Sequence, residues 1–266
     1  ARLPGGRMLR IGVDKAVAGA LAGARACALR YDKRGVGASG GEYLRAGMDN
    51  RRAGARAALG WLAARTGGLP PLAIGHSEGA WYAAELAADH AVAGAVLLTG
   101  GARPAEEILS WQTEMAAARL PPTARMILKI TRTDIIRTQR KRVVRISAST
   151  GDVIRIQGFR INARWWRDFL AYDPRPALAR ITVPVLAITG GQDVQVPPQG
   201  TAPTPGDRAR DECPGSQLLA SHPGTLSRHR RSACLSRRVS RRWRRLLLSG
   251  SWGSGCCCRG SGSASR

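Results

Sequence analysis

A serine between two glycines is the residue of this sequence best suited to nucleophilic chemistry. Ser77 lies in the segment GHSEG at 75–79, between an apolar run at 69–74 that predicts a strand and an alanine-rich run at 80–88 that predicts a helix. A sharp turn from strand to helix would hold the serine in strained dihedral angles and expose its Oγ. The N–H of Glu78 would open the helix and could donate to an oxyanion. The alternative is a serine in a tight glycine turn without chemistry.

An acidic residue after a later apolar run is the second candidate. Asp193 follows the run at 183–189, which predicts a buried strand, and the two glycines behind it. An acid at the carboxyl end of a late strand can orient a histidine and stabilise its imidazolium form. The alternative is an aspartate that closes a Gly-Gly turn.

The elements that would position these residues alternate between helical and strand patterns. Helices are predicted at 13–24, 49–65 and 80–88, and strands at 26–31, 69–74, 92–99 and 183–189. Continuous apolar strands separated by helices favour an α/β fold with a mostly parallel sheet covered on both faces. Residues 104–180 interrupt this alternation with a mostly helical pattern, and such an insertion is a natural lid over an active site.

Three segments, taken together, resemble the α/β-hydrolase superfamily. They are RYDKRGVGAS at 30–39, the GHSEG segment and PVLAITGGQD at 184–193. The first is similar to the D-x-R-G-x-G-x-S loop after the fourth strand of that fold, and the closest likeness is to bacterial esterase-like members near the serine aminopeptidase-like branch. The resemblance covers residues 5–199. It implies a helical cap and the order Ser before Asp before His.

The resemblance implies a role for each candidate residue. Ser77 is the nucleophile, Asp193 the triad acid, and Glu78 an oxyanion donor through its backbone N–H. The histidine should follow the last strand, about 30 residues after the acid, and His222 lies at that distance although no strand pattern precedes it. His229 is a poorer candidate because neighbouring arginines disfavour an imidazolium. We expect His76 to pack inside the turn and His90 to be a solvated helix end.

The last quarter of the chain carries about +10 of its positive charge. The net charge is +24, and residues 200–266 carry 13 Arg and 12 Ser against three acidic residues. One explanation is a basic tail that binds nucleic acid or a membrane surface. The other is an out-of-frame translation of GC-rich DNA. We therefore predict a partial hydrolase domain at 1–199, with the cap at about 104–180, and a low-complexity tail at 200–266 that is disordered.

Several further expectations follow from composition. The sequence contains no run of about 18 apolar residues, so no membrane span is predicted. The chain begins without methionine, and the first strands of the family, with the second oxyanion donor, would precede Ala1, so we expect a domain truncated at its N-terminus. Cys27 is the only cysteine before residue 200, and no disulfide framework is indicated, which favours a reducing, cytoplasmic location.

The predicted cap carries two groups of side chains with open interpretations. Its basic run either forms a solvated face or attracts anionic substrates or acidic surfaces; it comprises Arg132, Arg137, Arg140, Lys141, Arg142 and Arg145. Its aromatic residues either line an apolar acyl pocket or pack in the core; they are Trp111, Trp165, Trp166 and Phe169.

The sequence thus predicts a serine hydrolase acting on carboxylic esters or related acyl substrates. It needs no metal or organic cofactor, and its partner is a small-molecule acyl substrate. The alternatives are a peptidase or amidase of the same fold, an inactive hydrolase fragment, and a basic protein that binds nucleic acid or surfaces non-specifically through its tail.

Overall fold

The computed structural model describes residues 13–24, 26–190, 193–197 and 216–221. The described residues up to Tyr31 belong to one unit, and those from Asp32 onward belong to a second. The first unit contains helix α1 (Val13–Gly23), which confirms the helix predicted from the alanine-rich pattern.

The strand predicted at 26–31 is absent from the described part of the first unit. Four of these six residues are exposed, and none has strand geometry. The prediction was wrong because an apolar run becomes a strand only beside another strand that supplies main-chain hydrogen bonds. The described part of this unit contains only α1 besides the segment.

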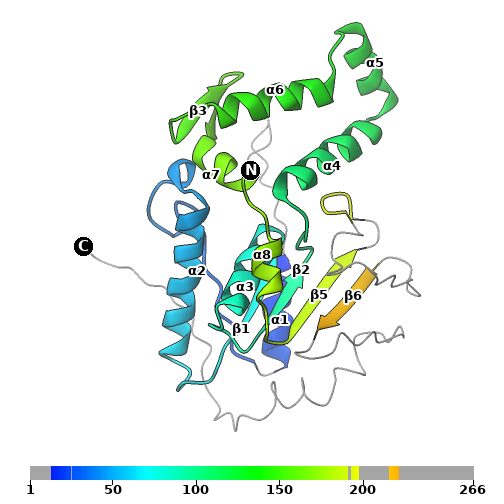
Figure 1. Ribbon diagram of the computed structural model, residues 1–266. Helices are drawn as coiled ribbons and strands as arrows, with labels where there is room; N and C mark the ends of the chain where they lie inside the picture. The colour runs from blue at the N-terminus through cyan, green and yellow to red at the C-terminus, as the bar shows by residue number, and fades with distance from the viewer. Residues whose placement is uncertain (1–12, 25, 191–192, 198–215, 222–266) are drawn as a thin grey trace. The chain divides into compact units, whose positions relative to one another are not determined.

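The second unit is built on a four-stranded sheet with the order β1-β2-β5-β6 (Figure 1). The strands are β1 (Leu72–His76), β2 (Gly94–Leu98), β5 (Val185–Gly190) and β6 (Ser216–Ser221). The first three run parallel, and β6 is antiparallel to β5. The predicted parallel sheet is confirmed, and its three parallel strands fall within the predicted runs to within two residues.

Strand β6 lies in the segment where the sequence shows no strand period. All six of its residues pair with β5, from Gly190 opposite Ser216 to Val185 opposite Ser221. An edge strand is held by main-chain hydrogen bonds, which almost any residue can make, so periodicity need not reveal it. Predictions for the other residues of 200–266 lie outside the described residues.

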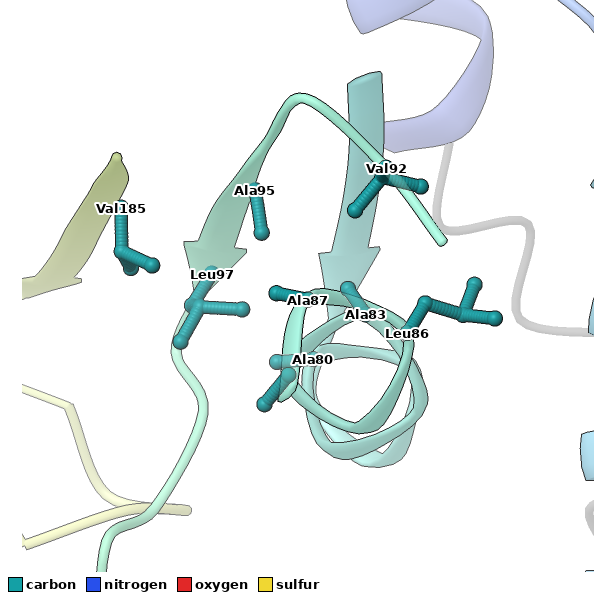
Figure 2. Close-up of a cluster of buried hydrophobic side chains, with 9 residues drawn as sticks. Ala80, Ala83, Leu86, Ala87, Val92, Ala95, Leu97 and Val185 are labelled. Atoms are coloured by element: carbon teal, nitrogen blue, oxygen red, sulfur yellow. The ribbon is translucent and has the colours of Figure 1, made fainter. Parts of the chain in front are cut away.

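The core of the sheet is formed by small side chains. Helix α3 (Glu78–Ala88) packs on β1 and β2, and Figure 2 shows its alanines close to Ala95 and Leu97 of β2. Alanine favours the helix and lets its axis approach the sheet closely. The same unit contains the short helix η1 (Tyr43–Arg45), α2 (Met48–Ala63) and α8 (Arg175–Ala179).

The predicted insertion between β2 and β5 is confirmed as mostly helical. It contains α4 (Ala105–Ala118), α5 (Pro122–Ile130), α6 (Ile135–Ser147) and α7 (Ala163–Leu170). The sequence reading missed a hairpin of β3 (Val153–Ile156) and β4 (Phe159–Asn162) within it. Gln157 and Gly158 form its turn with φ of 51° and 82°, and this glycine between alternating apolar residues is the signal that was overlooked.

Candidate active site

The turn at Ser77 has the strained geometry that the glycine-flanked motif predicts. Ser77 joins β1 to α3 with φ of 55° and ψ of −121°. Residues other than glycine rarely adopt this backbone conformation. Its N–H donates to the Leu98 carbonyl at 2.9 Å, and its own carbonyl accepts from Ala80 N at 2.9 Å. These bonds hold the strain in place, and Ser77 is exposed at the end of the strand.

Gly75 is the glycine that the turn requires. It is buried, and a Cβ at this position would overlap the Gly79 carbonyl group and lie 2.6 Å from Ala80 N. The chain after the serine therefore crosses directly over β1. At Gly79 a Cβ would meet no atom of the described residues within 4 Å, so the close approach exists at Gly75 and not at Gly79.

The carboxylate of Asp193 closes a turn just beyond β5. Asp193 N donates to the Gly190 carbonyl at 3.0 Å. Its Oδ1 accepts from Gln195 N at 2.7 Å and from Val196 N at 3.2 Å. These two hydrogen bonds fix one carboxylate oxygen. Helix α4 reaches this turn, because Gln112 Nε2 donates to the Gln195 carbonyl at 2.8 Å.

The register of the parallel strands places Ser77 and Asp193 on one edge of the sheet. His76 pairs with Leu98, and Leu98 pairs with Ile188. Ser77 and Asp193 follow the outer two of these three strands at their carboxyl ends. Because neighbouring strands lie about 4.8 Å apart, the two chains leave the sheet about 10 Å from each other.

The predicted histidine lies outside the described residues, as does His229. The strand before His222 runs antiparallel to β5 and ends with Ser221 opposite Val185, at the amino end of β5. Ser77 and Asp193 lie at the other end of the strands.

The two described histidines do not hydrogen-bond Ser77. His76 is exposed, so the prediction that it packs inside the turn was wrong: it is the last residue of β1, where the sheet ends. His90 is exposed beyond the end of α3, as predicted, and its Nδ1 lies 3.2 Å from Thr182 Oγ1.

The side chain of Glu78 is the feature that sequence reasoning missed. Its carboxylate is largely buried and accepts hydrogen bonds from four side chains. They are Lys33 Nζ at 3.1 Å, Arg51 Nη1, Tyr82 Oη at 2.5 Å and Trp165 Nε1 at 2.9 Å. Burial raises the pKa of Glu78, but the charges of Lys33 and Arg51 and the hydrogen bonds together hold it below its ordinary value.

The most buried partner of Glu78 is Arg51 of α2, whose side chain is 5% exposed. Its guanidinium carbon lies 4.9 Å from the ring centre of Trp165 and 5.5 Å from that of Tyr43. The residue after the serine is thereby tied to the 32–41 loop, to α2 and to α7 of the insertion. Only Tyr82, four residues after Glu78 on the same helix, could have been inferred from spacing.

The aromatic residues of the insertion pack mainly in a core. Phe169 lies 5.0 Å from Trp165 and 5.6 Å from both Trp166 and Trp81 between ring centres. Phe169 and Trp81 belong to a buried cluster on which Trp165 and Trp166 pack. Trp111 is not part of this cluster and is half-buried, with no hydrogen-bond partner for its Nε1 in the described residues.

The described residues contain neither a cluster of metal ligands nor a helix that could span a membrane. No group of three or more His, Cys, Asp or Glu within them is arranged to hold a metal ion. None of the helices in this part of the chain is both long and apolar enough to cross a bilayer.

A parallel sheet with a strained serine at a strand–helix turn and an acid beyond a later strand defines the α/β-hydrolase class of proteins. A family model described as serine aminopeptidase, S33, matches residues 6–216, and the chain belongs to this α/β-hydrolase family. The comparison with curated proteins gave no match.

Proposed function

We propose that this chain is a serine hydrolase of carboxylic esters or related acyl substrates, with Ser77 as its nucleophile. The observation that carries the proposal is the strained and exposed Ser77 between β1 and α3, held by two backbone hydrogen bonds. Such strain persists only where the surrounding structure enforces it, and it is typical of functional positions. The family of the chain supports the same chemistry.

The proposed reaction uses groups of the chain alone. Ser77 Oγ attacks the acyl carbonyl while a histidine takes its proton, and the Glu78 N–H at the start of α3 donates to the oxyanion. The histidine returns the proton to the leaving group, and water then releases the acyl chain from the serine by the reverse sequence. Both hydrogen bonds that the described residues give the Asp193 carboxylate end on Oδ1, which leaves Oδ2 for the histidine.

A second candidate is a hydrolase fold without a working base. It is favoured by the direction of β6, whose last residue lies opposite Val185. Six antiparallel residues span about 20 Å, so the end of this strand at Ser221 lies far from the edge that carries Ser77. The base assigned from the sequence, His222, is therefore the member of the triad whose test decides between the two candidates.

The test is labelling of the purified chain with a fluorophosphonate probe. Wild type, Ser77→Ala and His222→Ala are compared, with circular dichroism as the folding control. The proposal expects labelling of wild type that Ser77→Ala abolishes, and at least a hundredfold slower labelling of His222→Ala. A folded but unlabelled wild type would overturn the proposal in favour of the second candidate.

Paired ester and amide substrates test which type of bond the chain cleaves. The family description names aminopeptidases, so amide cleavage is the alternative to ester cleavage. We propose ester cleavage and expect p-nitrophenyl acyl esters to be hydrolysed at least tenfold faster than amino-acid p-nitroanilides relative to their uncatalysed rates. The reverse order would assign a peptidase, and Ser77→Ala is the control in both assays.

A further inference from the structure

Helix α5 is amphipathic, and its apolar face is exposed instead of packed in a core. Met126, Ile127 and Ile130 are 61%, 58% and 72% exposed. They lie at positions i, i+1 and i+4, so they share one face of the helix. Single exposed apolar residues are common, but three on one face of a short helix mark a surface that contacts something apolar.

The surroundings of this face are strongly basic. Residues 119–145 contain nine Lys or Arg and one acidic residue, Asp134. Asp134 caps α6 by accepting from Arg137 N at 3.0 Å. Most of the nine side chains are exposed, and no ion pair to any of them occurs within the described part of the chain.

The basic residues lie next to the apolar face. On α5, Arg125 and Lys129 are one residue before Met126 and Ile130 and flank them along the helix. On α6, Val144 is 67% exposed and shares a helix face with Arg137 and Lys141. Each helix therefore presents aliphatic and cationic groups together.

We propose that α5 and the basic face of α6 form a docking surface for an anionic lipid bilayer. The aliphatic side chains of α5 enter the boundary between headgroups and acyl chains, and the Lys and Arg side chains contact the lipid phosphates. This division of labour is that of amphipathic helices which lie in the plane of a membrane interface.

Charge and composition select this occupant over the others. A second copy of the chain, with a net charge of +24, and its own segment 200–266, with 13 Arg against three acidic residues, both carry the charge of the surface itself. Single-stranded nucleic acid is held by phosphate contacts and by stacking on aromatic rings. The exposed residues of α5 are aliphatic, and an aliphatic face gains most from acyl chains.

The test is binding of the full-length chain to vesicles by co-sedimentation. Phosphatidylcholine vesicles with about one third phosphatidylglycerol are compared with pure phosphatidylcholine at about 0.15 M salt. The variant Met126→Gln/Ile127→Gln/Ile130→Gln keeps the charge of the chain, including its basic tail. Phe159→Gln is the matched control, since Phe159 on the β3–β4 hairpin is 71% exposed.

We expect wild type to prefer the anionic vesicles by at least tenfold. The triple variant should lose at least tenfold in partitioning, and Phe159→Gln should change it by less than twofold. All side chains that are changed are exposed, so the melting temperature should not move. Triple-variant binding equal to wild type would overturn the proposal and assign the attraction to charge alone. Equal binding of wild type to both kinds of vesicle would overturn the role of the basic residues.

Discussion

Two groups of charged residues in this chain have opposite environments. Around Glu78, opposite charges are packed together with aromatic rings, and three of the four hydrogen bonds to its carboxylate join different elements. On α5 and α6, like charges are exposed, and their helices make few contacts beyond α4 and α7. The first group is suited to fix the turn that carries Ser77, and the second is suited to bind an external ligand.

A buried charge and an exposed charge contribute differently to stability and to binding. A buried pair has been desolvated, so losing one partner leaves the other without compensation. An exposed cation keeps its hydration and costs little to remove. The two groups should therefore respond very differently to the same kind of substitution.

Glu78→Ala should give the largest effect. It leaves the Arg51 guanidinium buried without its carboxylate, and the expected loss is about 3–5 kcal/mol in the free energy of unfolding. Urea denaturation followed by circular dichroism measures it. A loss below about 1 kcal/mol would show that Arg51 finds solvent or another partner, and the contrast between the two groups would fail.

Protonation of Glu78 at low pH should destabilise the fold in the same direction as Glu78→Ala, but gradually. The pKa of Glu78 lies below its ordinary value of 4.5 in the folded chain, so the unfolded chain binds the proton first as pH falls. The stabilisation is therefore complete above pH 4.5 and is lost as pH falls below it toward the folded pKa. The free energy of unfolding, measured with urea from about pH 6 to pH 3, should fall more steeply for wild type than for Glu78→Gln. Parallel curves for the two proteins would contradict the assignment.

Gly75→Ala tests the backbone of the same region. The new Cβ would meet backbone atoms of Gly79 and Ala80, which cannot rotate away as a side chain could. We expect a loss of about 2–3 kcal/mol together with loss of fluorophosphonate labelling. Gly79→Ala is the matched control, since its Cβ meets no described atom within 4 Å. Equal effects of the two substitutions would refute the steric argument.

Trp165→Phe should have a moderate effect. It removes the indole N–H that donates to Glu78 Oε1 at 2.9 Å and keeps a ring beside Arg51. A hydrogen bond to a charged group contributes about 1.5–3 kcal/mol, and we expect the lower end of this range in urea denaturation. Trp166→Phe removes a neighbouring indole that donates no hydrogen bond to Glu78, so it provides the baseline for the lost ring area.

Sequence reasoning found the parts of the site that depend on local chain geometry. The strain at Ser77, the parallel strands beside it and the acid beyond β5 all follow from patterns a few residues long. It failed at 26–31, where strand formation depends on a neighbour, and at β6, where the main chain alone makes the ladder.

The Glu78 network was not predictable for a related reason. Arg51 lies 27 residues before Glu78 and Trp165 lies 87 residues after it, and no local period links such positions. From sequence alone, a charged residue in a polar helix is predicted to be solvated. Its burial beside a carboxylate becomes apparent only in the folded structure. The basic run of α6 has the same local appearance as Arg51, and only the three-dimensional arrangement distinguishes them.

The smallest expected effect on stability belongs to that basic run. Arg137→Gln/Arg140→Gln/Lys141→Gln removes three exposed charges without ion-pair partners in the described residues, so the free energy of unfolding should change by only about 0.5 kcal/mol. It should rise slightly if anything, because like charges repel. Binding to anionic vesicles should nevertheless weaken by at least tenfold, and its dependence on salt should become shallower. A variant that is strongly destabilised would mean that these side chains are structural, as Arg51 is, and the distinction between the two groups would not hold.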